Sequence, residues 1–345
     1  MHSQNFVVHH FGGDALNDLR FERHTSLQWI IDDYIKYCAD NGKIGFVTGD
    51  FAVYNFCRMT GIEAELIHRE SPPEYTGVID LAGDNELAES FYLDLKDNKP
   101  GCLHNQYVDV DGGSEVYRWD NKEGFVRVKR RFFQSGYFGR VEPKDAYQTM
   151  VFDSIMRNQI TAITGPAGSG KTLISLAAAM SLIENKKYEK LTILFNPTKA
   201  KGAVDTGFIP GDAFDKAMCS SVGNMLITKF GDLDLIRQMV SAGTLSLVNM
   251  ADCRGMEISG KEILYITECQ NTSVDLLKLA LERGGDGAKV IIEGDYDSQV
   301  DSGLYENKKN GLVRAIDVFK GSDIFGCVKL KSIYRGEVSR LASLM

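Results

Sequence analysis

From residue 142 onward, short apolar runs alternate along the chain with stretches whose apolar residues recur at helical spacing. A short apolar run is typical of a strand that is buried on both faces of a sheet. Strands that alternate with helices predict a parallel sheet with helices on both faces, which is an α/β fold. The expected strands are residues 159–164, 191–195, 245–249, 262–266, 288–293 and 327–330.

Before residue 142 the pattern predicts smaller units. The expected elements are, in order, a helix at 27–38, a strand at 44–48, a short helix through Met59, a helix at 86–97, and strands at 106–110, 115–119 and 124–133. A proline-containing loop at 71–77 separates the first three of these elements from the rest. We therefore expect three regions: residues 1–70, residues 71–141 with a linker helix and a small β unit, and residues 142–345.

The stretch from Gly165 to Thr172 fits the pattern GxxxxGK[ST] and lies between an expected strand and an expected helix, as a P-loop requires. Its glycines let successive backbone N–H groups converge on a phosphate at the positive end of the helix. Lys171 would reach the β- and γ-phosphates of ATP, and Thr172 would offer its hydroxyl to Mg²⁺. The predicted nucleotide-binding residues are Gly165, Pro166, Ala167, Gly168, Ser169, Gly170, Lys171 and Thr172.

The strand at 262–266 delivers Thr267 and Glu268 to the edge of the sheet where the P-loop lies. Glu268 would orient or deprotonate the attacking water, although a surface charge at the end of a strand is the alternative. An aspartate normally steadies Mg²⁺ through its water shell at the position of Thr267. Threonine adds no charge there, so we expect an indirect contact through water and weaker metal binding and turnover.

Two glutamines are further candidates. Gln299 follows the next strand and the pair Gly294 and Asp295. It would contact the γ-phosphate or the attacking water. An amide can respond to loss of the phosphate without being titrated itself. Gln148 lies upstream of the P-loop, where its amide would hydrogen-bond to the edge of the adenine ring.

Composition and charge limit the class of protein. The 345 residues are 43% hydrophobic and 25% charged, as in ordinary globular proteins, and no apolar run is long enough to cross a membrane. Seven scattered cysteines without a CxxC pair predict buried free thiols in a reducing compartment, so we expect a cytoplasmic protein. A net charge of −8 disfavours a surface that coats nucleic acid but leaves room for a local basic channel. Residues 105–345 contain no histidine, which leaves carboxylates, hydroxyls, amides and Mg²⁺ for chemistry.

One stretch of the small β unit mixes basic and aromatic residues. Phe125 precedes the basic residues Arg127, Lys129, Arg130 and Arg131, and Phe132 and Phe133 follow them. Such a mixture binds single-stranded nucleic acid through phosphate contacts and base stacking. Strand alternation that solvates the charges and buries the rings explains the same pattern, and we favour it.

Together these features resemble the PhoH family of ATPases over residues 142–345. The stretches that carry the resemblance are 165–172, 207–212 (Gly-Phe-Ile-Pro-Gly-Asp) with Asp215 and Lys216, Arg254 with Gly255, 267–271, Gly294 and Asp295 with Gln299, 310–312, and Tyr334 with Arg335. The resemblance implies a RecA-like P-loop core similar to that of superfamily 1 helicases, with ATP and Mg²⁺ as cofactors. It also implies helicase-like action on single-stranded nucleic acid, with RNA favoured.

Arg335 falls where the family carries an arginine. Supplied by a neighbouring subunit it would be an arginine finger, which implies a homo-oligomeric ring, with a hexamer favoured. A surface salt bridge is the alternative role for this residue. This sequence departs from the family pattern at two places. Thr267 replaces the family aspartate, and the spacing from Gly294 to Gln299 is one residue longer than usual.

The first region resembles part of a PIN nuclease domain. The strand at 44–48, the Thr48-Gly49-Asp50 turn and the helix after it are similar to the last strand and helix of such domains, with Asp50 at an active-site carboxylate. No strand with a matching aspartate is expected before Ile44, so we expect a truncated unit without nuclease activity. Shortened forms of this kind resemble phage-borne members, which would act in the host cytoplasm.

The sequence therefore predicts a Mg²⁺-dependent ATPase with Lys171, Glu268, Gln299 and Arg335 as its catalytic residues. Two alternatives stay open. Because Thr267 carries no charge, the protein would instead be a nucleotide-binding switch or scaffold with weak turnover. The second alternative is a PIN-type RNase with an ATPase motor.

Overall fold

The computed structural model describes residues 46–48, 51–59, 61, 64–66, 74–82, 85–196, 213–298, 300–301 and 310–334. The chain divides into two compact units, Met1–Glu74 and Tyr75–Met345. The small β unit and the large parallel sheet thus belong to the same compact unit. The predicted division into three functional regions stays a prediction.

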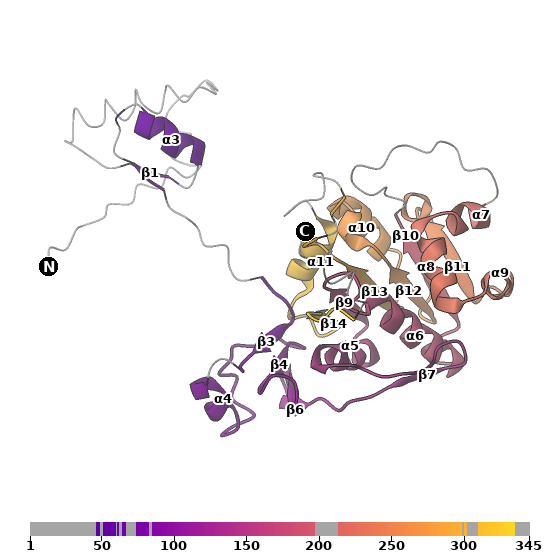
Figure 1. Cartoon of the computed structure of the whole chain (residues 1–345), viewed down its shortest axis with the longest axis horizontal. Coiled ribbons are helices and arrows are strands. Elements are labelled where there is room, and N and C mark those ends of the chain that lie inside the picture. The colour runs from indigo at the N-terminus through magenta and orange to yellow at the C-terminus, as the bar shows by residue number, and fades with distance from the viewer. Residues whose placement is uncertain are drawn as a thin grey trace. The chain divides into compact units, whose positions relative to one another are not determined.

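A six-stranded parallel sheet forms the centre of the second unit (Figure 1). Its strands follow the order β11-β10-β12-β13-β9-β14, and every neighbouring pair is parallel. All six predicted strands are present, and the α/β prediction is confirmed. The strands are β9 (Ile160–Thr164), β10 (Lys190–Phe195), β11 (Leu245–Asn249), β12 (Glu262–Ile266), β13 (Lys289–Gly294) and β14 (Phe325–Lys329).

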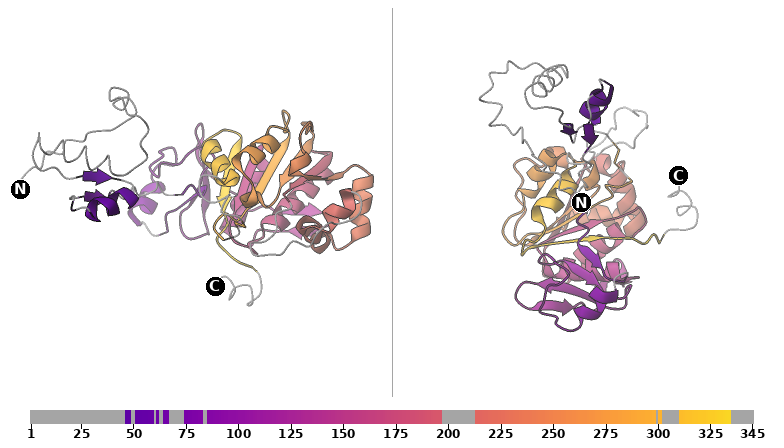
Figure 2. Two further views of the ribbon diagram at one scale, coloured as in Figure 1. Left: turned by 90° about the horizontal axis from the view of Figure 1, so that it is seen from above. Right: turned by 90° about the vertical axis from the view of Figure 1, so that its left-hand side faces the viewer.

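Helices cover both faces of this sheet because alternate residues of each strand point to opposite sides (Figures 1 and 2). In β12, Ile263 and Tyr265 join one buried cluster, and Leu264 and Ile266 join the other. The first cluster is shared with α5 (Ala146–Arg157), α6 (Lys171–Glu184), α7 (Ala213–Met218), α8 (Ser221–Phe230) and α9 (Leu233–Ser241). The second is shared with α10 (Val274–Leu281) and α11 (Gly311–Phe319).

A smaller four-stranded sheet has the order β3-β4-β5-β6, with β3 parallel to β4 and the other pairs antiparallel. Its strands are β3 (Val78–Asp80), β4 (Tyr107–Asp109), β5 (Val116–Asp120) and β6 (Gly124–Arg127), and α4 (Asn85–Phe91) packs on it. The expected helix over residues 86–97 is therefore too long. It ends at Phe91 because the chain turns to let the Leu95 carbonyl accept a hydrogen bond of 2.7 Å from the Phe125 N–H.

The expected strand at 124–133 is two strands. The first is β6, and Phe133 then begins β7 (Phe133–Ser135), which pairs with β8 (Gly139–Val141). Phe133 stacks on Phe152 of α5, with ring centroids 4.5 Å apart, so its burial against the large sheet's helix separates it from β6. Phe125 and Phe133 are buried, whereas Phe132 is half exposed beneath the guanidinium of Arg140. For two of the three rings, the favoured explanation by burial is correct.

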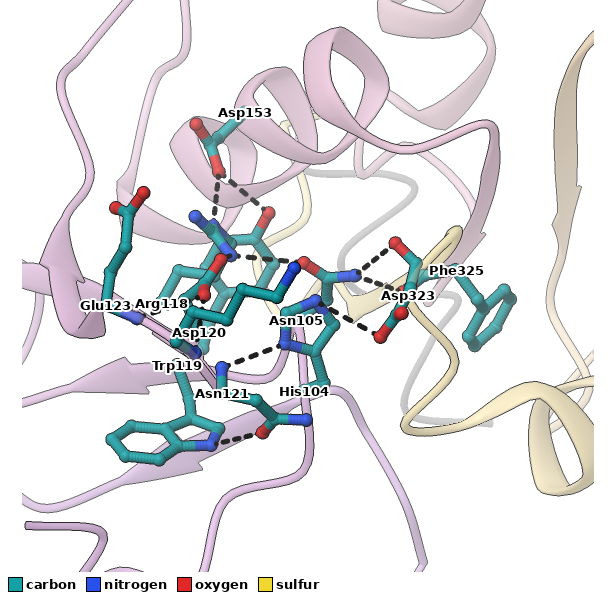
Figure 3. Close-up of polar contacts among 12 residues, drawn as sticks. His104, Asn105, Arg118, Trp119, Asp120, Asn121, Glu123, Asp153, Asp323 and Phe325 are labelled. Atoms are coloured by element: carbon teal, nitrogen blue, oxygen red, sulfur yellow. Dashed lines mark hydrogen bonds and ion pairs between the residues drawn. The ribbon is translucent and has the colours of Figure 1, made fainter. Parts of the chain in front are cut away.

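Polar side chains join the small sheet to α5 and to the chain before β14 (Figure 3). The Tyr107 hydroxyl donates to Asp153 at 3.1 Å, and the guanidinium of the buried Arg118 lies 3.7 Å from the same carboxylate. Arg118 also donates to Asn105 at 3.1 Å, and Asn105 donates to the Phe325 carbonyl at 3.1 Å. A buried network therefore links β4 and β5 to the P-loop sheet.

In the first unit, β1 (Phe46–Thr48) pairs in parallel with β2 (Ala64–Leu66), and α3 (Phe51–Met59) connects them. The expected strand and short helix are thus present, and β2 was not expected. The expected helix at 27–38 and Asp50 lie outside the described residues. Likeness to a PIN domain stays a prediction.

The six described cysteines are free thiols; five are buried as expected, but Cys219 is exposed. Within the part of the chain that the structure describes, no helix combines the length and the apolar character needed to span a bilayer.

Candidate nucleotide site

The P-loop connects β9 to α6, so the strand, loop and helix of the sequence pattern occur in the expected order. Gly165 adopts a φ of +127°, and a Cβ at this position would lie 2.4 Å from the Leu330 carbonyl oxygen. Only glycine therefore fits where β14 leads the chain past the loop. At the start of α6, Gly170 gives no side-chain cap, so the first N–H groups of the helix stay available to an anion.

Lys171 lies over the P-loop and interacts with its backbone. Its Nζ donates to the carbonyl oxygens of Gly165 at 2.6 Å and Pro166 at 3.0 Å. The Oγ atoms of Ser169 and Thr164 are buried without a hydrogen-bond partner among the described residues. A loop with a cation on its inner side and unpaired hydroxyls nearby has the polar groups that a bound phosphate needs.

Gln148 of α5 lies against the P-loop and is 4% exposed. Its Nε2 donates to the Ser169 carbonyl at 2.9 Å, and its Oε1 accepts from the Lys144 N–H at 2.8 Å. Both ends of the amide are thus bonded to backbone groups in this structure. Hydrogen bonding of Gln148 to the adenine edge stays a prediction.

A carboxylate that the sequence analysis did not single out lies next to the P-loop. Glu293, the residue before the last of β13, is 2% exposed. Its Oε1 accepts a hydrogen bond from Thr172 at 2.8 Å and one from Thr267 at 3.2 Å. The Tyr265 hydroxyl donates to the same oxygen, and the Ser175 hydroxyl lies 3.4 Å from Oε2.

The register of the sheet explains this convergence. β13 lies between β9 and β12, so its end is adjacent to both the P-loop strand and the strand that carries Thr267. Ile292 pairs with Ile266, which brings the next residues, Glu293 and Thr267, side by side. The signal in the sequence was a carboxylate at the end of an apolar strand. Spacing alone did not reveal its neighbours.

Burial raises the pKa of Glu293 above its usual range, while the hydrogen bond from Tyr265 and the charge of Lys171 oppose that rise. Burial and the neighbouring Glu293 carboxylate raise the pKa of Tyr265 well above its ordinary value, so the phenol stays a hydrogen-bond donor. The carboxylate of Glu268 also acts on Glu293 and raises its pKa. Lys171, Glu268 and Glu293 therefore belong to one electrostatic site.

Glu268 is exposed and adopts a left-handed backbone conformation, with φ of 55° and ψ of 37°. This conformation is uncommon for residues other than glycine, and such strain occurs at functional sites. Gln270 donates a hydrogen bond from Nε2 to the Glu268 carboxylate. The strained backbone turns the chain from the buried Thr267 into the short helix η2 (Cys269–Asn271) and leaves the carboxylate at the surface.

The buried residues Gln270 and Asn271 hold this turn against the loop after β13. The Gln270 Oε1 accepts from the Asp295 N–H at 3.1 Å, and Asn310 donates to the Gln270 carbonyl at 2.9 Å. Asn271 donates to the Asp301 carboxylate at 2.6 Å and accepts from the Asp301 N–H at 2.9 Å. Glu268 is thus fixed relative to the end of β13.

Several predicted residues lie outside the described part of the chain. These are Gln299, Arg335 and the stretch 207–212. The residue before Arg335 is described: the Tyr334 N–H donates to the Gly168 carbonyl of the P-loop at 3.0 Å. The structure therefore brings together Gln148, Lys171, Thr172, Thr267, Glu268 and the additional Glu293.

Comparison with known proteins bears on this site. Residues 140–343 match the family described as PhoH-like protein. Protein PhoH2 of Bacillus subtilis (strain 168) is 31% identical over 288 residues, which cover 78% of this chain and 63% of that protein. The PhoH-like protein of Mycobacterium tuberculosis (strain ATCC 25618 / H37Rv) is 30% identical over 199 residues, or 56% of this chain and 53% of that protein. The chain thus spans between about half and two thirds of the length of these relatives.

Solved structures align more weakly. The UvsW helicase from bacteriophage T4 gives a TM-score of 0.33 and 12% identity, and the alignment covers 93% of this chain and 94% of that one. The Pif1 helicase from Candida albicans gives a TM-score of 0.30 and 17% identity over 57% of this chain and 42% of that one. These scores are too low to equate the folds.

Proposed function

The chain belongs to the PhoH-like protein family, and on that premise we propose that it is a Mg²⁺-dependent ATPase with helicase-like action on single-stranded nucleic acid. Hydrolysis would drive movement along the strand or its remodelling, and RNA is the favoured track. The observation that carries the proposal is the group of Lys171 and Thr172 with two carboxylates at one edge of the sheet. Positioned charges of both signs are what phosphoryl transfer requires.

The residues of the site have distinct tasks in this reaction. Lys171 would exchange the Gly165 and Pro166 carbonyls for phosphate oxygens, and the N–H groups at the start of α6 would bind the same phosphates. Mg²⁺ bound with the nucleotide would neutralise part of the negative charge of the phosphates. The hydroxyl of Thr172 and the carboxylate of Glu293 are oxygen ligands that fit this ion, and the Thr267 hydroxyl would contact it only through water.

Glu268 is the proposed general base. Its carboxylate would accept a proton from the attacking water as the water oxygen bonds to the γ-phosphorus, and the bond from that phosphorus to the ADP oxygen would break. Gln299 would contact the γ-phosphate or the water. Arg335 would be supplied by a neighbouring copy of the chain in a ring, with a hexamer favoured.

The first test is ATP hydrolysis with and without single-stranded RNA and DNA. We expect turnover that one of the two polymers stimulates, and loss of turnover in Lys171→Ala and Glu268→Gln. The two variants separate binding from chemistry, because Glu268→Gln should still bind ATP. Hydrolysis that neither polymer changes would refute the coupling to nucleic acid.

A subunit-mixing experiment tests the ring. Lys171→Ala and Arg335→Ala should each be inactive alone. When the two are mixed, some interfaces pair an intact P-loop with an intact arginine, so partial activity should return. No recovery on mixing, with both variants of wild-type oligomeric size, would contradict supply of Arg335 from a neighbour.

A nucleotide-binding switch is the second candidate, and the uncharged Thr267 favours it. It predicts tight ATP binding with negligible turnover whether or not nucleic acid is present. An RNase function stays a prediction, since Asp50 lies outside the described residues. The cytoplasmic location and the phage origin also stay predictions.

A further inference from the structure

Thr267 leaves the proposed metal site short of one negative charge. In sites of this type an aspartate on the strand of Thr267 steadies Mg²⁺, and Mg²⁺ bound beside phosphates is held by only one or two carboxylates. The loss of one carboxylate is therefore a large change for such a site. The charge must come from elsewhere if the metal is to be held as firmly.

Glu293 lies where that charge is needed. The pairing of Ile266 with Ile292 makes positions 267 and 293 neighbours on adjacent parallel strands. The Thr267 hydroxyl donates to Glu293 Oε1 at 3.2 Å, and the Thr172 hydroxyl donates to the same oxygen at 2.8 Å. One carboxylate oxygen is thus within hydrogen-bond reach of both the residue that replaces the aspartate and the P-loop hydroxyl proposed for Mg²⁺.

Glu293 is a buried carboxylate whose described hydrogen bonds come from uncharged groups. The side chain is 2% exposed, and its described hydrogen-bond partners are the neutral hydroxyls of Thr172, Tyr265, Thr267 and Ser175. Among the described residues, no cation forms an ion pair with Glu293 within 4.0 Å. A buried carboxylate without a paired cation costs several kcal/mol. A divalent cation beside Thr172 would offset that cost.

We propose that Glu293 supplies the acidic group that Thr267 lacks and holds Mg²⁺ together with the Thr172 hydroxyl and the nucleotide phosphates. In this chain the acidic residue stands at the end of β13 instead of the end of β12, and the hydroxyl of Thr267 orients its carboxylate. This inference rests on the proposed function, because it names how the same site holds its metal. It also removes the main reason to expect a switch with weak turnover.

The test is equilibrium binding of a non-hydrolysable ATP analogue by calorimetry, in Mg²⁺ and in EDTA. Wild-type protein should bind more tightly in Mg²⁺. In Glu293→Gln, which keeps the size of the side chain and one oxygen that accepts hydrogen bonds but removes the charge, that gain should fall by about tenfold or more. Glu262→Gln is the matched control, since Glu262 begins β12 at the opposite edge of the sheet and should leave the gain unchanged.

A swap of the two side chains gives a second and independent variant. Thr267→Asp/Glu293→Thr returns the carboxylate to β12, keeps the net charge, and should retain the Mg²⁺-dependent gain in affinity. This variant decides the matter if Glu293→Gln does not fold. Loss of the gain in the folded double variant would show that the two positions are not equivalent and would overturn the proposal.

The possible outcomes separate this inference from the proposed function. If the wild-type protein does not bind the analogue, the ATPase proposal fails and Glu293 has no nucleotide-bound metal to hold. If the wild-type protein and Glu293→Gln bind with the same Mg²⁺-dependent gain, the ATPase proposal stands and the role of Glu293 is refuted. Loss of the gain in Glu293→Gln together with its retention in the double variant supports both.

Discussion

Gln148 and Ser169 are joined by a hydrogen bond of 2.9 Å from the Gln148 amide to the Ser169 carbonyl, which ties α5 to the P-loop. The other end of the amide accepts from the Lys144 N–H. In this position Gln148 braces the P-loop, whichever base the nucleotide carries.

We therefore expect Gln148→Ala to weaken the binding of ATP and GTP by similar factors. The change removes two hydrogen bonds, each of which contributes about 1 kcal/mol. Titration of both nucleotides against the wild-type protein and the variant is the measurement. A selective loss of ATP binding would instead assign Gln148 to the adenine edge.

Thr267→Asp alone should not improve the enzyme. It would place a second carboxylate next to the buried Glu293, and two carboxylates in contact repel each other. We expect a loss of about 1–3 kcal/mol in the free energy of unfolding, measured in urea without nucleotide. Thr267→Asn is the control, because asparagine has nearly the same shape as aspartate but no charge. Its free energy of unfolding should fall by less. Higher stability and turnover in Thr267→Asp would contradict the role of Glu293.

Glu268 stores backbone strain that glycine would relieve. Because its φ is 55°, Glu268→Gly should unfold with a free energy about 1 kcal/mol higher than Glu268→Ala. Both variants remove the proposed base, so both should lose hydrolysis while still binding ATP. Denaturation curves and steady-state assays on the same preparations would test the pair. Equal stabilities would indicate that the turn relaxes when the side chain is removed.

The buried network of Figure 3 should be essential for folding of the second unit. Arg118→Met would leave the buried Asp153 carboxylate without its cation, so we expect a loss of about 3–5 kcal/mol in the free energy of unfolding. Arg127→Ala is the control from the next strand. Its side chain is 62% exposed and its guanidinium pairs with Glu115, and removing such a surface pair costs about 1 kcal/mol or less. Similar losses in the two variants would argue against the network.

Burial of Lys289 predicts how the free energy of unfolding changes with pH. Its Nζ donates to the carbonyls of Ile155 and Asn158 at the end of α5, and burial lowers its pKa from 10.5 to about 8. Between these two pH values the unfolded chain holds more protons than the folded chain, so the free energy of unfolding rises with pH.

Relative to Lys289→Met, the wild-type protein should therefore gain stability from pH about 8 to pH about 10.5. The gain should approach about 3 kcal/mol, since each pKa unit corresponds to about 1.4 kcal/mol. Urea unfolding of both proteins across this range measures the difference, and all other titrating groups cancel. A difference that does not change with pH would mean that the folded protein leaves the pKa of Lys289 near 10.5.

Local residue patterns were enough to predict the strands of the large sheet and the position of the P-loop. Six apolar runs became six strands, because a strand buried on both faces is apolar along most of its length. The loop from Gly165 to Thr172 was equally recognisable, because its glycines and Lys171 stand at a spacing that phosphate binding requires. These signals are local, and residues near one another in the chain carry them.

Which of those elements lie next to one another depends on the folded chain as a whole. Thr172 and Glu293 are separated by 121 positions in the chain, and the order and register of β9, β13 and β12 bring them to hydrogen-bonding distance. The contact of Phe133 with Phe152, which divides an expected strand in two, also depends on segments distant in sequence. Periodicity shows which face a residue occupies, but contacts across a parallel sheet depend on strand order, which a local pattern does not contain.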